Sequence, residues 1–275
     1  MKAFKFLFVP FVVLVFFGFN KSYQYDKIDG DFAHQSISTK KPFHKGEEIT
    51  YLVHYGFLDA GEATLSVKDE DATIDGSPVY HVVGEGKTLS MFEWFYKVRD
   101  VYESHIDEKA MTPRKFKRRV NEGGYTLQRD YHFVPEEKKV LTKKKGEIKT
   151  PENVQDMLSS FYYLRALDFS NAKKGQVFQI NAFMDYEHWP VYVKFMGEEN
   201  VKIKMGSYNC LKFVPMVQEG RVFRNNDDLE IWVSNDANKV PILVKANIYV
   251  GSVKAELTSH KNLEAPLTKT SKWSL

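Results

Sequence analysis

Cysteine is almost missing from this 275-residue chain, which contains only Cys210. An internal disulfide is therefore impossible, and the fold must be held by its own hydrophobic core. Cys210 lies in an apolar stretch without an activating neighbour. This context predicts a small buried side chain rather than a nucleophile.

Motifs that carry chemistry are missing as well. The sequence has no phosphate-cradling glycine loop, no zinc-ligand spacing and no paired-carboxylate signature. Ser159 and Ser160 lack the Gly-x-Ser-x-Gly turn that surrounds a hydrolase nucleophile. We therefore assign no catalytic residue, no metal site and no cofactor. Enzymatic activity is disfavoured but not excluded, because catalytic groups can converge from distant strands.

The chain has one long hydrophobic run, Phe6–Phe19, which follows Lys2 and Lys5. This is the layout of a secretory signal peptide, and the run is too short to cross a bilayer comfortably. We predict that residues 1–22 are a signal peptide removed on export, with an uncleaved anchor as the alternative. No cysteine ends the run, which excludes a bacterial lipoprotein anchor. The expected location is the periplasm or another exported site, with no stable transmembrane span.

Charge of one sign gathers in one region. The net charge is +3, but Lys109–Lys149 holds thirteen Lys or Arg against five Asp or Glu. Such an excess is typical of a surface that meets anionic lipid headgroups, and it is equally typical of the solvated outer face of a hairpin. Nucleic acid is disfavoured as a partner by export and by the lack of a binding motif. The residues predicted to contact anionic headgroups are Arg114, Lys117, Arg118 and Arg119.

Alternation of apolar and polar residues dominates the rest of the chain. Ile49–Tyr55 and Ala63–Val67 flank a glycine-containing turn and predict a hairpin with one buried face. About a dozen strands follow at hairpin spacing, which favours a mainly β protein with one curved antiparallel sheet or a half-open β-barrel. Tandem sandwiches are the alternative. The predicted strands after this hairpin are Tyr80–Gly84, Tyr96–His105, Arg114–Val120, Tyr125–Val134, Lys138–Thr142, Val177–Met184, Val191–Phe195, Val201–Met205, Cys210–Val217, Leu229–Ser234, Pro241–Val250 and Val253–Thr258.

One segment, Val154–Leu167, reads as a helix that covers the sheet. Thr150 can cap it, Pro151 suits the first helical position, and Val154, Met157, Leu158 and Phe161 form an apolar stripe. The pattern leaves Asp156, Ser159 and Tyr163 toward water or a rim. The domain organisation predicted from these patterns is a polar linker at 23–45, a single β-rich domain at 46–260 and a C-terminal tail at 261–275.

Three segments together resemble a known family. They are Gly46-Glu47-x-Ile49-x-Tyr51 with Ala60-Gly61-x-Ala63, the helix Asp156-x-Leu158-Ser159-x-Phe161-Tyr162-x-Leu164-Arg165, and Ile231–Asp236 followed by Pro241. The resemblance is to an exported bacterial family catalogued as domain of unknown function 3108, and it runs from about Gly46 to Leu257. It implies an exported β-rich domain without an assigned activity. The general plan also looks like periplasmic lipoprotein carriers, a likeness of architecture that does not dictate function.

The leading functional hypothesis is a non-catalytic exported protein that binds a lipid, an acyl chain or a lipidated partner between helix and sheet. Asp156 and Arg165 would orient a polar headgroup in this hypothesis, although a structural tie between helix and sheet is the favoured role for both. The residues predicted to bind the ligand are Asp156, Phe161, Tyr162, Arg165 and Trp232.

Two other functions stay open. An envelope module that binds protein or polysaccharide would expose a row of aromatics among Trp94, Trp189 and Trp232, whereas burial of these side chains favours the carrier. A hydrolase of envelope polymers would use Asp185, Glu187 and His188, which are more simply a polar turn. Asp130 and His132, two apart on one strand, are expected to be a surface pair.

Overall fold

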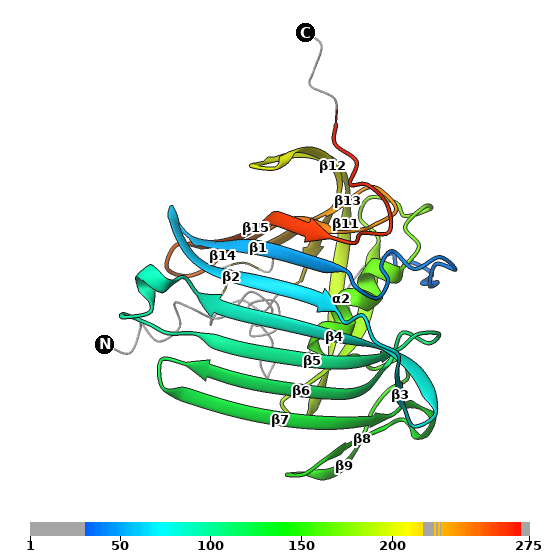
Figure 1. Cartoon of the computed structure of the whole chain (residues 1–275). Coiled ribbons are helices and arrows are strands. Elements are labelled where there is room, and N and C mark those ends of the chain that lie inside the picture. Colours follow the sequence, from blue (N-terminus) through cyan, green and yellow to red (C-terminus); the bar gives the residue numbers. More distant parts are fainter. Residues whose placement is uncertain (1–30, 217–222, 224, 226, 271–275) are drawn as a thin grey trace.

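The computed structural model describes residues 31–216, 223, 225 and 227–270 (Figure 1). Its strands form one antiparallel sheet in the order β10-β11-β12-β13-β14-β15-β1-β2-β4-β5-β6-β7-β8-β9, with β3 paired to β4 beside this path. The mainly β prediction is confirmed, and the tandem-sandwich alternative is wrong. The strands are β1 (Glu48–Tyr55), β2 (Leu58–Val67), β3 (Ala72–Ile74), β4 (Ser77–Thr88), β5 (Arg99–Asp107), β6 (Pro113–Glu122), β7 (Tyr125–Val134), β8 (Lys139–Thr142), β9 (Gly146–Lys149), β10 (Val177–Met184), β11 (Glu187–Ile203), β12 (Gly206–Pro215), β13 (Leu229–Ser234), β14 (Pro241–Asn247) and β15 (Ser252–Lys261).

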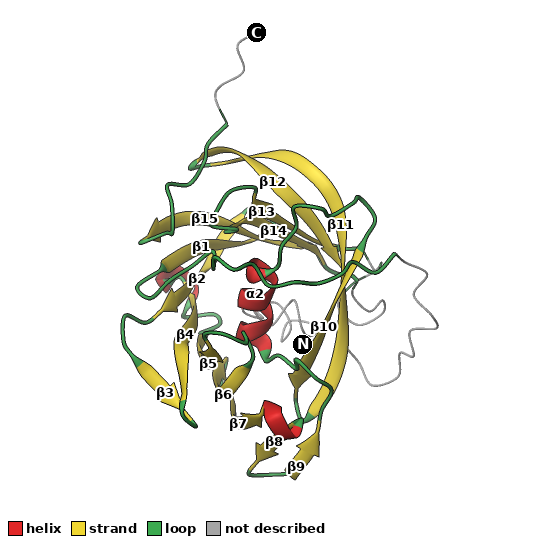
Figure 2. Ribbon diagram, turned by 90° about the vertical axis from the view of Figure 1, so that its right-hand side faces the viewer, coloured by secondary structure: helices red, strands yellow, loops and turns green. Residues whose placement is uncertain are grey.

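The sheet curves around the helix α2 (Met157–Ala166), the only α-helix among the described residues (Figure 2). Its two end strands, β9 and β10, do not pair with each other, so the sheet is a half-open barrel. Side chains that alternate inward along each strand meet the helix in one core. The predicted curved sheet with a helical cover is confirmed.

Polar chain segments cover the free edge of β10. Val177 N donates to Asp31 O at 3.0 Å, and Phe183 N donates to Gln155 O at 2.7 Å. The described part of the predicted linker, residues 31–45, therefore packs on the domain, and Phe43 is fully buried in the core. The sequence of this segment gives no sign of the pairing, because edge pairing uses backbone groups and needs no alternation of side chains. Residues 1–22, the predicted signal peptide, lie outside the described part of the chain.

The helix begins later than predicted. Asp156 is its N-cap and accepts hydrogen bonds from the backbone N–H groups of Leu158 and Ser159, while the Ser159 hydroxyl accepts from the backbone N–H of Asp156. Thr150 and Pro151 belong to the preceding connection. The prediction that Asp156, Ser159 and Tyr163 face water or a rim is wrong, since all three are buried. An amphipathic stripe assumes one covered face, but the curved sheet surrounds α2.

A single strand replaces two predicted ones in β11. The sequence predicts two strands here, Val191–Phe195 and Val201–Met205. Instead the chain continues, and a bulge shifts the register between Phe195 and Gly197. Gly197 has a φ of 97°, which glycine adopts without strain, so the glycine marks a bulge rather than a turn.

One glycine sets how closely the helix approaches the sheet. A Cβ atom at Gly84 of β4 would lie 3.0 Å from Leu158 Cδ2 and 3.2 Å from Leu65 Cδ2. Both distances are shorter than ordinary contacts between carbon atoms. The missing side chain at Gly84 therefore makes room for Leu158 to seat on β4.

We expect Gly84→Val to lower the free energy of unfolding by about 1–3 kcal/mol, because the added carbons overpack the contact with Leu158. Urea unfolding measures this change. Glu85→Val, on the exposed opposite face of the same strand, is the control and should change stability little. The double variant Gly84→Val/Leu158→Ala should destabilise by less than the sum of its single changes. If the losses of unfolding free energy in the two single variants simply added in the double variant, the proposed contact between residue 84 and Leu158 would be contradicted.

Candidate functional site

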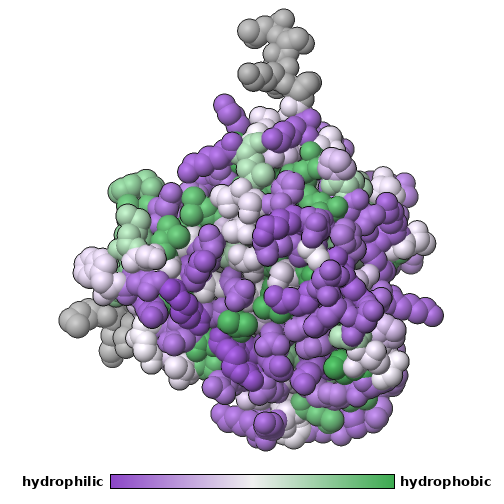
Figure 3. Space-filling model, viewed as in Figure 1, coloured by the Kyte–Doolittle hydropathy of each residue, from purple (hydrophilic) through white to green (hydrophobic). Residues whose placement is uncertain are grey.

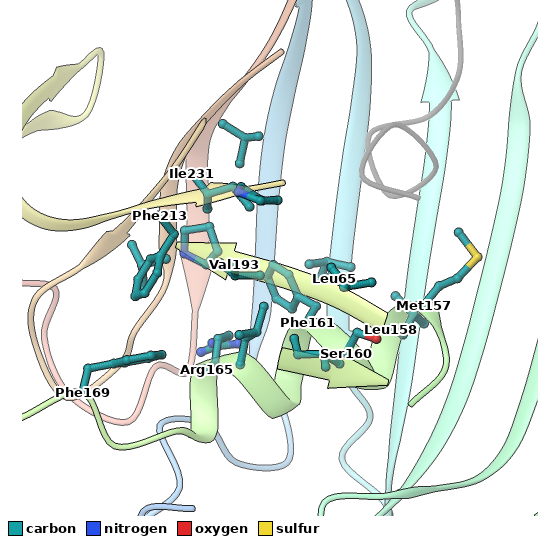
Figure 4. A pocket seen from close by; sticks show the side chains of 17 residues that line it. Leu65, Met157, Leu158, Ser160, Phe161, Arg165, Phe169, Val193, Phe213 and Ile231 are labelled. Carbon is teal, nitrogen blue, oxygen red and sulfur yellow. The ribbon is translucent and has the colours of Figure 1, made fainter. Parts of the chain in front are cut away.

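An apolar cavity of about 100 Å³ lies between α2 and the concave face of the sheet (Figure 4). Phe161 and Leu164 of the helix, three residues apart and half-buried, contribute to its wall. All of its lining residues except Ser160 and Arg165 are apolar. They are Leu65, Met157, Leu158, Ser160, Phe161, Leu164, Arg165, Phe169, Ile180, Val191, Val193, Phe213, Pro215, Ile231, Val233, Pro241 and Val244.

A buried ion pair fixes the C-terminal end of α2. Arg165 Nη1 donates to Glu47 Oε1 at 2.6 Å and Nη2 donates to Glu47 Oε2 at 2.8 Å, so the pair is bidentate. Nη2 also donates to the carbonyl oxygens of Pro42 and Asn238. Burial opposes the charge of the guanidinium, but Glu47 outweighs it and raises the pKa of Arg165. Arg165 thus reaches the cavity wall as a structural tie with its charge already matched.

The N-terminal end of α2 is tied to β5. The Ser104 hydroxyl donates to Asp156 Oδ2 at 2.6 Å, and the N–H groups of Leu158 and Ser159 each donate to Oδ1 at 2.8 Å. Burial raises the pKa of Asp156 to about 7, although these hydrogen bonds favour the carboxylate. Asp156 and Arg165 therefore occupy the tying positions that the sequence favoured for them.

The structure brings two of the five predicted ligand-binding residues, Phe161 and Arg165, to the cavity. Asp156 and Tyr162 are buried beside it, and the Tyr162 ring packs at 4.8 Å on the Phe43 ring. Trp232 does not line the cavity, which corrects its predicted role.

Strand alternation explains the position of Trp232. Its neighbours Ile231 and Val233 line the cavity, so Trp232 points to the opposite face of β13. There its ring lies 4.8 Å from Lys212 Nζ and 4.9 Å from Lys245 Nζ. Sequence reasoning selected the large aromatic and missed the aliphatic residues on either side, although their alternation with Trp232 was the available signal.

The basic segment does not form one basic face. Arg114 and Arg118 lie on the same side of β6 as the buried Phe116, and both are buried. Arg114 pairs with Asp107 at 3.1 Å and Glu136 at 2.7 Å. Contact of Arg114 or Arg118 with a headgroup at the surface is therefore incompatible with their positions in this structure.

The two other predicted headgroup contacts are partly exposed on the outer side of β6. Lys117 pairs with Glu103 at 3.2 Å, and Arg119 pairs with Asp130 at 2.6 Å. Their contact with an anionic headgroup stays a prediction.

Sequence reasoning missed a pair of acids at the neighbouring ends of β5 and β6. Asp100 is fully buried, and it accepts a hydrogen bond from Asn121 N at 2.9 Å. Burial and the nearby Asp100 carboxyl raise the pKa of Glu122 to about 8, and burial raises the pKa of Asp100 as well. The Arg118 guanidinium lies near both acids and sits 5.6 Å from the centre of the Tyr102 ring. These residues are far apart in sequence, and only the strand pairing brings them together.

The polar turn proposed for a hydrolase connects β10 to β11. Asp185 and Tyr186 both have positive φ, at 49° and 73°, as a tight two-residue hairpin requires. Asp185 lies 3.7 Å from Arg118 and 3.5 Å from Arg129, so it bridges the gap between the sheet ends. Glu187 and His188 continue directly into β11.

The other titratable candidates lie apart from one another. Asp130 pairs with Arg119, whereas His132 pairs with Asp75 at 2.9 Å. Cys210 is buried, and burial raises the pKa of its thiol to about 12. Within the described ranges no three His, Cys, Asp or Glu side chains are grouped to hold a metal ion.

The fold and site define a half-open β-barrel with an apolar cavity beneath one helix. The chain belongs to the family of proteins of unknown function DUF3108, whose model matches residues 50–258. No curated protein matches it. It is similar in fold to the crystal structure of a β-barrel-like protein of domain of unknown function DUF1849 from Brucella abortus, with a TM-score of 0.50 and 10% identity over 82% of this chain and 100% of that chain. Across the described residues, no helix has the length and apolar character needed to cross a membrane.

We expect Arg165→Met to destabilise the protein by about 3–5 kcal/mol, because Glu47 is left as an unpaired buried charge. Urea unfolding tests this. The double variant Arg165→Met/Glu47→Leu removes both charges and should be more stable than Arg165→Met alone. A double variant less stable than the single one would show that the ion pair itself, rather than the orphaned carboxylate, dominates the effect.

The acid pair should make stability fall with rising pH. Folding raises the pKa of Glu122, so the folded protein keeps a proton that the unfolded chain releases, and the free energy of unfolding decreases from about pH 4.5 to about pH 8. Urea midpoints across this range should decline less in Glu122→Gln. Asp156, whose pKa is also raised, contributes to the decline in stability equally in the wild type and in Glu122→Gln. Parallel declines in the two proteins would refute the assignment to Glu122.

Proposed function

We propose that this protein is an exported, non-catalytic carrier or receptor that holds a single acyl chain between α2 and the sheet. The observation that carries the proposal is the apolar cavity, which is enclosed by a helix tied at both ends. Its walls offer dispersion contacts and few hydrogen-bonding groups, so they favour a hydrocarbon over a sugar or a peptide.

The size of the cavity limits its occupant. At about 100 Å³ it is smaller than the ~300–1,000 Å³ that hold drug-sized ligands. An apolar cavity of about 150 Å³ stays dry and accepts a benzene molecule. The cavity in this state therefore suits the end of an acyl chain, while the rest of the lipid or lipidated partner lies outside it.

Phe161 and Leu164 indicate where the chain would enter. Both are partly exposed while they line the cavity, so their side chains lie between the cavity and the surface. Rotation of one such side chain opens a path without breaking the ties of α2 at Asp156 and Arg165. The carboxylate or headgroup of the ligand would then stay near the surface, because Arg165 is already bonded to Glu47.

The predicted signal peptide supports the same proposal. The Phe6–Phe19 run with its preceding lysines reads as a signal peptide, and export would bring a cavity-bearing protein into the cell envelope, among lipids. An envelope module for protein or polysaccharide is the alternative. Its expected aromatic row is not formed by the three tryptophans together, since Trp94 is exposed, Trp189 is half-buried and Trp232 is buried.

Ligand uptake tests the proposal. Native mass spectrometry of the protein from an exporting host should show a bound lipid in a one-to-one complex, and the delipidated protein should take up a fluorescent fatty acid. Val193→Phe, which fills the cavity, should weaken this uptake by about tenfold or more, since each buried methylene contributes about 0.8 kcal/mol. The proposal fails when delipidated wild-type protein binds no acyl probe.

The control for the cavity variant is Lys194→Phe. Lys194 is exposed on the opposite face of β11, so the same new ring there leaves the cavity unchanged. Uptake by this variant should equal that of the wild type. Equal losses in both variants would show that the substitutions disturb β11 rather than fill the cavity.

A further inference from the structure

Large apolar side chains are exposed together at one end of the sheet. Strands β14, β1, β4 and β6 run toward this end, and their partners β15, β2, β5 and β7 return from it, so four connections lie side by side there, at the left in Figure 1. Hydrophobic residues gather at the same edge in Figure 3. We call this set the apolar rim: Phe57, Leu58, Met91, Trp94, Phe95, Tyr125, Tyr249 and Val250.

Exposure in the rim is far greater than ordinary packing leaves. Phe57 is 93% exposed and Trp94 is 84% exposed, each at the tip of a different connection. Large apolar groups that gather on a surface mark an interaction site, whereas single ones need no explanation. The exposure of the rim therefore indicates a binding partner that removes these side chains from water.

The connections that carry the rim are held in place. Trp94 follows the short helix η2 (Ser90–Phe92), and its indole N–H donates to Met91 O at 2.9 Å. Hydrogen bonds also join these connections to their neighbours. Tyr55 Oη at the end of β1 donates to Val250 O at 2.7 Å, Leu89 N donates to Ala60 O of β2 at 3.1 Å, and Gly123 N donates to Lys97 O at 2.9 Å. The exposed side chains are thus presented by an ordered frame, and the Trp94 indole N–H needs no water when the ring is buried.

Charge at the rim suits an anionic surface. Glu93 pairs with Arg99, and Glu62 pairs with Lys87 at 2.7 Å, so these carboxylates are neutralised. Asp59, next to Leu58, lies 2.7 Å from Nδ1 of the His54 ring. Lys97 is exposed, and no ion pair joins it to any residue in the described ranges. The turn at 143–145, which holds three exposed lysines, faces the same end from a position set back along β7.

We propose that the apolar rim docks the protein on an anionic phospholipid bilayer. Trp, Tyr and Phe side chains favour the boundary between headgroups and acyl chains, and lysine is attracted to anionic headgroups. A bilayer also accepts separate tips that enter side by side, whereas a protein partner would have to match the gaps between four hairpins. The rim is a docking surface distinct from the cavity, so the inference goes beyond the proposed function.

Sedimentation with vesicles of phosphatidylcholine and phosphatidylglycerol in equal parts tests the proposal. Wild-type protein should bind, and brominated lipids should quench the fluorescence of Trp94. Phe57→Ser/Trp94→Ser should weaken binding by about tenfold or more, because two large side chains no longer enter the bilayer. Trp94→Phe keeps an apolar ring, so it should retain binding while losing most of the quenching.

Phe32→Ser is the matched control. Phe32 is 48% exposed and lies beside the start of β10, at the end of the sheet opposite the rim. This variant should bind vesicles as the wild type does. Every variant shares the same N-terminal run, so that run cannot produce a difference between them. Far-ultraviolet circular dichroism and urea midpoints confirm that the variants are folded.

Three results would overturn the proposal. The first is binding of Phe57→Ser/Trp94→Ser at the wild-type level, and the second is Trp94 emission that brominated lipids leave unquenched. The third is a dimer in sedimentation velocity that depends on the rim, with no vesicle binding, which would make a second copy of this chain the partner. Val193→Phe separates the two proposals, since it should bind vesicles normally even when acyl uptake is lost.

Discussion

The buried ion pair between Arg165 and Glu47 is the constraint on which the rest of the structure depends. A guanidinium in the core is tolerated only when a carboxylate and further acceptors surround it. Glu47 immediately precedes β1, and Asn238 lies between β13 and β14, so the pair joins α2 to both segments at once. With Asp156 held by Ser104 of β5, the helix has fixed ends on well-separated strands. It can close the concave face only in this orientation, and the cavity is the space that remains beneath it.

The barrel is not fully closed, and this affects how easily the cavity beneath α2 can change its volume. A closed barrel fixes its diameter through strand number and stagger, whereas an open sheet can change curvature without breaking ladder hydrogen bonds. Here side chains join the ends: the Tyr131 and Phe183 rings lie 5.1 Å apart, and Asp185 reaches Arg129 across the gap. Such contacts are weaker than a strand ladder. The volume beneath α2 can therefore adjust to an occupant at lower cost than in a closed barrel.

Sequence reasoning found the features that have a period and missed those that depend on pairing. Alternation along strands such as β7 predicted the mainly β sheet, and the apolar content of Val154–Leu167 predicted the helix. The start of the helix was wrong because Thr150 offered a plausible cap, while the actual cap, Asp156, is chosen by its contact with Ser104. Alternation with Trp232 was a signal for Ile231 and Val233 of the cavity wall. The acid pair Asp100 and Glu122 had no such signal, because only the pairing of β5 with β6 brings the two residues together.

The cavity and the apolar rim are separate features, but the topology of the sheet brings one end of the cavity wall to the end of the sheet that carries the rim. The cavity wall includes Pro215, the last residue of β12, and Ile231 near the start of β13, and both strands meet the rim end of the sheet there. Bare hydrocarbon in water costs about 0.8 kcal/mol for each exposed methylene, so a carrier needs a path along which the chain stays covered. A rim that enters the bilayer beside the end of the cavity wall would supply such a path. The same arrangement leaves the headgroup in the interface, where the buried and already paired Arg165 does not need to meet it.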